Sequence, residues 1–254
     1  MSLPPARLER FARHIVLPEV GGAGQVALAG AHVALVGLGG IGSPALQYLA
    51  AAGVGTLTLI DRDVVDASNL QRQTIYREAD LGRPKAEMAA RWVAQFDGSL
   101  KVRAHTGTVG GDGAARYLEG TDLVLDGCDN FATRLAVSDA CVKLGIPLTS
   151  AAIGRFQGQV ANFAGHLEGQ ACYRCFVGDA FDADDCDTCA ADGVLGAMAG
   201  MIGAFAAMQA IRVLLIGTAT LGDPQWGQLH LFEGLVPSLR TLRIAKDPEC
   251  RGCN

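Results

Sequence analysis

The feature that most constrains this chain is a short apolar run followed at once by a glycine-rich turn. Residues 33–36 are apolar, residues 37–42 read Gly-Leu-Gly-Gly-Ile-Gly, and a helix-like stretch follows over 43–52. This order predicts a buried strand over 32–36, a tight turn and a helix N-terminus. Bare backbone N–H groups and the positive end of a helix dipole can meet a phosphate there. The sequence therefore predicts a nucleotide site, with its turn glycines at Gly37, Gly39 and Gly42.

An acidic residue ends the next predicted strand, 56–61. Asp61 lies 24 residues after Gly37, and an acid about 20 residues beyond such a turn can accept hydrogen bonds from a ribose hydroxyl. The two strands with the helix between them form a βαβ unit, which is expected to be right-handed. This context favours a nucleotide site over a tight turn followed by a surface aspartate.

The rest of the pattern predicts one α/β domain over residues 1–254. Further strands are predicted at 101–105, 122–126 and 148–152, with helices at about 85–96 and 131–144. Near the N-terminus, a short amphipathic helix is predicted at 8–17, followed by a glycine turn at 21–24. Beyond residue 154, alternation predicts antiparallel strands at 158–163, 228–232 and 239–244. We expect a Rossmann-like fold, with a mostly parallel sheet, helices on both faces and an antiparallel continuation.

Composition excludes several other classes of protein. Hydrophobic residues at 50% and charged residues at 19% indicate a globular chain, and a net charge of -5 argues against bulk nucleic-acid binding. Residues 193–211 carry no charge and could span a membrane by length. Their Gly, Ala and Met content, and Gln209, favour a buried helix instead. Since residues 1–19 have no apolar h-region, a cytoplasmic location is expected.

Three polar residues lie between Asp61 and the start of the helix predicted at about 85–96. Asn69, Arg72 and Lys85 add two cations and an amide. A triphosphate calls for such cations, since arginine offers two donors to phosphate and lysine acts as a mobile point charge. Solvated loop charges are the alternative interpretation.

Two polar residues follow the strand predicted at 122–126. Asp129 could hold Mg²⁺ against phosphate oxygens, because this edge of an open α/β sheet binds ligands. Alternatively, Asp129 and Asn130 cap the helix that starts at residue 131. The two interpretations are compatible if Asn130 caps and Asp129 binds the metal.

Cysteines form three CxxC pairs. The first and last of these pairs could supply four thiolates to a closed tetrahedral Zn²⁺ site, which would attach the C-terminus to the body of the protein. A redox role for these pairs is the alternative. A third pair, Cys186 and Cys189, lies in an acidic run and could be a nucleophile, a disulfide or neither, while Cys128 and Cys141 are expected in the core. The predicted metal ligands are Cys172, Cys175, Cys250 and Cys253.

Taken together, these motifs resemble the ThiF/MoeB/HesA family, bacterial relatives of ubiquitin-activating enzymes. The resemblance runs from Arg7 to the C-terminus and rests on 37–43, Asp61, 68–73, 82–85, Asp129-Asn130 and the two outer CxxC pairs. It implies that ATP is bound by Gly40, Ser68, Asn69, Arg72 and Lys85 besides Asp61, that Asp129 handles Mg²⁺, and that the outer cysteines hold zinc. It also implies that residues 1–153 form the nucleotide part, and 154–254 the carrier-binding, zinc and crossover-loop part.

Two further roles are implied only by the resemblance. Arg13 resembles an arginine that reaches the ATP site of the other subunit of a homodimer, although His14 stands where family members often carry Gln. Cys189 resembles the thiol that in some members joins the activated carrier or passes sulfur; Cys186 is an additional cysteine beside it.

The implied reaction is ATP- and Mg²⁺-dependent adenylation of the C-terminal glycine of a ubiquitin-like sulfur carrier that ends in Gly-Gly. Such carriers serve thiamine, molybdopterin or related sulfur-transfer biosynthesis. Because the sequence ends at Asn254, we expect sulfur to come from a separate cysteine desulfurase or rhodanese-type protein. The alternatives are an NAD-dependent oxidoreductase, a family member that activates a small molecule or a tRNA base, and a non-catalytic zinc-stapled module. The two cations and the absence of triad-like histidine spacing weigh against the oxidoreductase.

Overall fold

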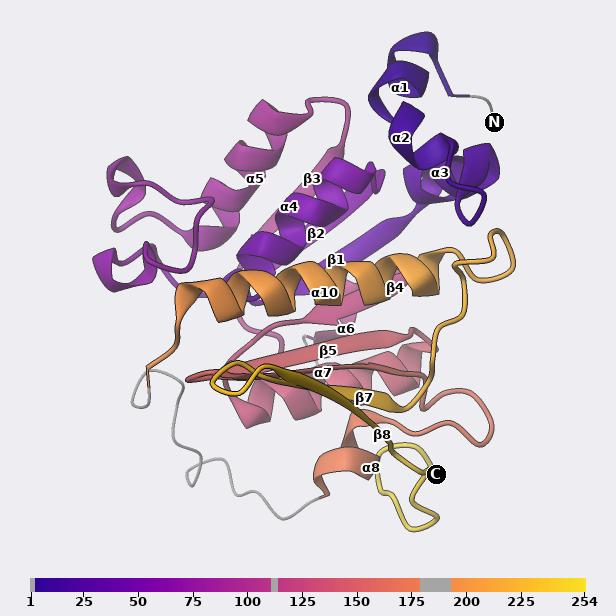
Figure 1. Cartoon of the computed structure of the whole chain (residues 1–254). Helices are drawn as coiled ribbons and strands as arrows, with labels where there is room; N and C mark the ends of the chain where they lie inside the picture. The colour runs from indigo at the N-terminus through magenta and orange to yellow at the C-terminus, as the bar shows by residue number, and fades with distance from the viewer. Residues whose placement is uncertain (1–2, 111–113, 179–192) are drawn as a thin grey trace.

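A computed structural model describes residues 3–110, 114–178 and 193–254. Its centre is one sheet in the order β3-β2-β1-β4-β5-β6-β7-β8 (Figure 1). The parallel strands are β1 (His32–Val36), β2 (Thr56–Asp61), β3 (Lys101–Thr106), β4 (Leu123–Asp126) and β5 (Leu148–Gly154). The antiparallel strands are β6 (Gln157–Phe163), β7 (Gln228–Glu233) and β8 (Ser238–Arg243). The predicted Rossmann-like sheet with an antiparallel continuation is confirmed.

Alternate residues of the central strand pack on opposite faces of the sheet. Val33 and Leu35 join a core cluster with residues of four helices, whereas Ala34 and Val36 join a second cluster on the other face. Helices therefore cover both faces, as predicted. The first cluster contains residues of α3 (Gly21–Gly30), α4 (Gly42–Ala52), α5 (Lys85–Phe96) and α10 (Gly196–Leu214). The second contains residues of α6 (Ala114–Leu118), α7 (Phe131–Leu144) and α8 (Tyr173–Val177).

Two local predictions near the N-terminus were wrong. The helix expected over 8–17 divides at Phe11 into α1 (Pro5–Arg10) and α2 (Ala12–Ile15), because the Phe11 ring is buried against Gly53, where a Cβ would overlap it. Residues 21–24, expected as a glycine turn, begin α3 instead. Gly24 allows close packing there, since a Cβ on it would lie 3.4 Å from the Leu215 side chain.

The charge-free stretch forms most of α10. By length and composition it is the one helix in the described part of the chain that could cross a membrane, and half of its most apolar window is buried. Figure 1 shows α10 lying across the sheet, and it contacts α4, β5 and β6. Ile202 and Ala206 are fully buried in the core, as expected for a core helix.

Candidate functional site

A cavity of about 500 Å³ opens where β1, β2 and β4 end. These ends meet at one edge because the three strands are parallel and adjacent. The predicted site residues that line the cavity are Gly37, Gly39, Gly40, Asp61, Ser68, Asn69, Arg72, Lys85, Asp129 and Asn130. The sheet thus brings together residues from five separate parts of the sequence.

The glycine turn closes by direct backbone contact. A Cβ on Gly42 would overlap the Gly37 carbonyl oxygen, so Gly42 shapes the turn without lining the cavity. Gly37 has φ +83°, and a Cβ there would lie 2.9 Å from the Cys128 backbone nitrogen. Both positions therefore require glycine, and α4 starts at the turn with its N-terminus toward the cavity.

Side chains from later in the sequence hold the turn at Leu38. Its backbone N–H donates to the Asp61 carboxylate at 2.7 Å, and its carbonyl accepts from the Ser43 and Tyr76 hydroxyls, each at 3.0 Å. The other Asp61 oxygen accepts from the Asp63 N–H at 2.8 Å. Burial raises the pKa of Asp61, while these backbone N–H groups and Lys85 oppose the shift. Asp61 therefore has a structural task at the turn besides the one predicted toward ribose.

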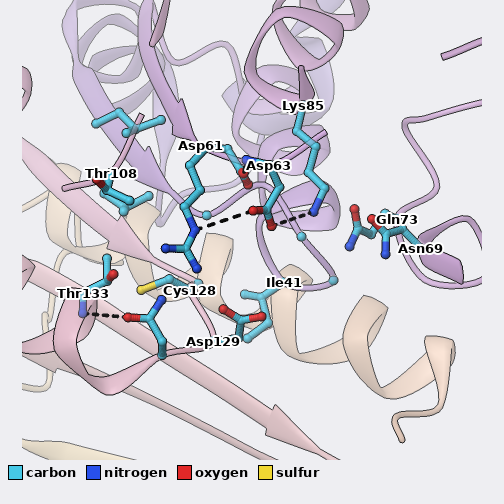
Figure 2. A pocket seen from close by; sticks show the side chains of 18 of the residues that line it. Ile41, Asp61, Asp63, Asn69, Gln73, Lys85, Thr108, Cys128, Asp129 and Thr133 are labelled. Carbon is cyan, nitrogen blue, oxygen red and sulfur yellow. Dashed lines mark hydrogen bonds and ion pairs between the residues drawn. The ribbon is translucent and has the colours of Figure 1, made fainter. Parts of the chain in front are cut away.

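One of the two predicted cations, Lys85, pairs with a residue that sequence reasoning missed. Asp63 lies 3.2 Å from the Lys85 ammonium and 3.6 Å from the Arg62 guanidinium. Figure 2 shows the Lys85 side chain pointing toward Asp63. Lys85 is buried, whereas Asp63 is half exposed. The Arg72 guanidinium donates to the Ser68 carbonyl at 2.9 Å. The signal for Asp63 was the sequence Asp-Arg-Asp at the end of β2.

The polar pair after β4 divides its tasks. Asn130 is the N-cap of α7, with its side-chain oxygen accepting from the Thr133 N–H at 2.8 Å. Asp129 is exposed at the cavity, across from Asp63 and Lys85 in Figure 2. A hard carboxylate oxygen beside a phosphate-binding turn is a donor that suits Mg²⁺, which takes a few protein oxygens together with phosphate oxygens and water.

The four outer cysteines come together as predicted. Their Sγ atoms all lie within 4.8 Å of one another, at 3.9 Å for Cys172–Cys175 and 3.6 Å for Cys172–Cys250 and Cys175–Cys253. Tetrahedral zinc with Zn–S bonds of about 2.3 Å separates its sulfurs by about 3.8 Å. The cluster could hold a metal ion, and it joins the C-terminus to α8.

Arg13 does not line the cavity of its own chain. Arg13 is exposed on α2, which contacts α3. Because α3 leads into the start of β1, this group lies at the amino end of the strand, away from the turn (Figure 1). Cys189, with Cys186, falls in 179–192 and so lies outside the described residues. Cys128 and Cys141 are buried, as expected.

A Rossmann-like sheet with a glycine turn, two cations and an open carboxylate at its carboxyl edge defines a nucleotide-binding protein. A model of the ThiF family matches residues 11–252, and the chain belongs to that family. It is 38% identical to a SAMP-activating enzyme E1 of Haloferax volcanii, over 100% of this chain and 91% of the relative. It is 40% identical to a sulfur carrier protein adenylyltransferase of Thermus thermophilus, over 97% of this chain and 90% of the relative.

The fold also matches that of a solved biosynthetic enzyme, MccB. The crystal structure of Escherichia coli MccB with ATP superposes with a TM-score of 0.78 at 19% identity, covering 96% of this chain and 74% of that one. At this identity the match concerns the fold. The family match confirms the resemblance predicted from the motifs, and it favours adenylation over the NAD-dependent alternative.

Proposed function

We propose that this protein is an adenylyltransferase that uses ATP to activate the C-terminal glycine of a ubiquitin-like sulfur carrier. The observation that carries the proposal is the meeting of the glycine turn, the cations Arg72 and Lys85 and the Asp129 carboxylate in one cavity. The names of the two relatives, a SAMP-activating E1 and a sulfur carrier protein adenylyltransferase, support the same activity. Asp61 is proposed to accept from the ribose hydroxyls.

In this reaction a carboxylate oxygen of the carrier attacks the α-phosphorus of ATP. A new P–O bond forms as the bond to the pyrophosphate oxygen breaks, giving an acyl-adenylate and pyrophosphate. The carboxylate is already ionised at pH 7, so no general base is needed. Arg72 and Lys85 act electrostatically on the charge that develops on the phosphates. Mg²⁺ held at Asp129 would add to this neutralisation.

The antiparallel end of the sheet offers a surface for the carrier. All six residues of β8, the outermost strand, are exposed, including Leu239 and Leu242. The hairpin before it exposes Leu235 and Val236 by 66% and 74%. The strand register places this hairpin at the same edge of the sheet as the cavity. We propose that the carrier docks here and sends its C-terminus toward the turn.

Further parts of the proposal rest on the family. Arg13 would reach the ATP site of the partner in a homodimer, because α2 lies away from the cavity of its own chain. Cys189 would receive the activated carrier or pass sulfur, and a separate desulfurase or rhodanese-type protein would supply the sulfur. The four-cysteine cluster would hold structural Zn²⁺ with no open position. A cytoplasmic location agrees with the state of the described cysteines. Their closest Sγ atoms lie 3.6 Å apart, which is too far for a disulfide bond, and disulfides are rare in cytosolic proteins.

Mass spectrometry tests the proposal directly. The protein is incubated with ATP, Mg²⁺ and purified carriers that end in Gly-Gly, and the carrier mass is measured. We expect at least one carrier to gain an adenylyl group, and the same carrier without its last glycine to gain none. A panel without any adenylated carrier, together with adenylation of a small molecule or a tRNA, would favour the other branch of the family.

A further inference from the structure

A buried arginine lies in the wall of the cavity, and no role was predicted for it. Arg134 projects from α7, and only 6% of it is exposed. Its guanidinium donates to the backbone carbonyls of Cys128 and, at 2.9 Å, of Ala151. It also lies 3.4 Å from the Ser150 hydroxyl on β5. One side chain thus joins the loop after β4 to the adjacent strand.

The counterion of Arg134 is equally buried. The Asp126 carboxylate is 1% exposed and lies 3.6 Å from the guanidinium. Its other oxygen accepts from the Cys128 backbone N–H at 3.0 Å. The N–H and the carbonyl of Cys128 are therefore both fixed, one by Asp126 and the other by Arg134.

This arrangement determines the position of the next residue. The Cys128 carbonyl belongs to the planar peptide group that carries the Asp129 nitrogen. Holding that carbonyl fixes the direction in which the chain enters Asp129. Within the described part of the chain, no hydrogen bond or ion pair holds the exposed Asp129 side chain itself. We propose that Arg134 is a positioning residue, which holds the 127–129 loop so that the Asp129 carboxylate meets the metal–ATP complex. The inference rests on the proposed function of the cavity.

The Arg134→Lys variant distinguishes the effect of the positive charge from that of the guanidinium's hydrogen-bond geometry. Arg134→Lys keeps a cation beside Asp126, but a single ammonium cannot reproduce the planar fork that spans two carbonyls and a carboxylate. The matched control is Arg91→Lys, which also removes an arginine from a buried partner, Asp80, outside the residues that line the cavity. The double variant Asp126→Asn/Arg134→Gln removes both charges together, in case the lysine variant does not fold.

The test measures metal binding rather than turnover. Mn²⁺ is titrated into each folded variant with a non-hydrolysable ATP analogue, and free Mn²⁺ is followed by electron paramagnetic resonance. Because loss of a group that orients a metal ligand commonly costs 10- to 100-fold in affinity, we expect Mn²⁺ binding to weaken by roughly tenfold or more in Arg134→Lys and in the double variant. Arg91→Lys should stay within about twofold of wild type, since that change leaves the ligand's surroundings intact.

Hydrogen exchange supplies an independent readout. The amides of residues 127–130 should exchange faster in Arg134→Lys than in wild type, with other segments unchanged. Wild-type Mn²⁺ affinity in the folded lysine variant, or in the double variant where lysine does not fold, would overturn the inference. Failure of the proposed function would look different, because the wild-type protein itself would then adenylate no carrier.

Discussion

The Asp61 carboxylate accepts a hydrogen bond from the Leu38 backbone N–H at 2.7 Å, which joins the end of β2 to the glycine turn after β1. Its second oxygen accepts from the Asp63 N–H. The residue that sequence patterns assign to ribose therefore also fixes the backbone of the glycine turn. Loss of its charge should affect the turn and the ligand together.

Asp61→Asn tests this double task. An amide can offer its oxygen to Leu38, but its NH₂ group then faces the Asp63 N–H and leaves this partly buried donor unpaired, which costs about 1 kcal/mol. We expect a lower free energy of unfolding in urea, and ATP binding weaker by roughly tenfold in calorimetry, as 1.4 kcal/mol corresponds to a factor of ten. Asp122→Asn is the control, since Asp122 accepts from the His32 backbone at 2.8 Å but does not line the cavity. Wild-type ATP affinity in Asp61→Asn would contradict the assignment.

The turn should not tolerate a methyl group at its last glycine, Gly42. In Gly42→Ala the new Cβ overlaps the backbone oxygen of Gly37, so the turn must open. We expect the free energy of unfolding to fall by about 1–3 kcal/mol, as in other overpacked sites, together with loss of ATP binding. Gly22→Ala in α3 is the comparison, because its Cβ meets nothing within 4 Å and alanine is favoured in a helix. Equal stability of the two variants would show that the turn can adjust.

Removal of one cysteine ligand should release the metal. Cys172→Ser leaves three thiolates in a cluster whose sulfurs are spaced for zinc. We expect elemental analysis to find about one zinc in the wild-type protein and much less in the variant. The melting temperature should fall by at least about 5 °C, because site binding energy contributes to folding. Cys141→Ala, at a buried cysteine outside the cluster, should retain zinc. Full zinc content in Cys172→Ser would exclude this cluster as the site.

Stability should decrease in mild acid partly through His32. Its Nδ1 lies 2.9 Å from the Gly120 carbonyl and its Nε2 lies 2.8 Å from the Thr58 hydroxyl, an arrangement that suits the neutral ring. Burial lowers the pKa of His32, and Arg103 lowers it further, against the opposing effects of Gly120 and Asp122. The unfolded chain therefore binds the proton more readily. The neutral His32 ring therefore stabilises the folded state above about pH 6.5. This contribution is lost as the pH falls through the lower pKa that His32 has in the folded protein.

Urea unfolding between pH 7.5 and 5 measures this effect. We expect the loss of stability on acidification to be smaller in His32→Gln than in wild type. An identical slope in both proteins would assign the acid sensitivity to other groups.

The regular elements were predictable because their periodicity is strong. The strands 32–36 and 56–61 and the helix 131–144 have the predicted bounds, since buried parallel strands are continuous apolar runs and α7 is bounded by an Asn cap and a glycine. The break at Phe11 depends on a tertiary contact with Gly53, which no local pattern contains.

The site was predictable where chemistry is repeated at a fixed spacing. Three of the glycines line one cavity with Asp61, Arg72 and Lys85, as expected. The four outer cysteines form a separate cluster, also as expected. Arg134 and Tyr76 were missed because each acts through backbone carbonyls of distant segments, and such contacts leave no spacing in the sequence.

Carrier-dependent exchange of labelled pyrophosphate into ATP tests the central claim most directly. The wild-type protein should catalyse exchange only with Mg²⁺ and a carrier that ends in Gly-Gly. Lys85→Met should lower the rate by about 10²–10³-fold, because it removes a preorganised charge from the phosphate site. Arg91→Lys, outside the cavity, should keep the wild-type rate. Exchange that does not depend on a carrier, or that persists at the wild-type rate in Lys85→Met, would contradict the account.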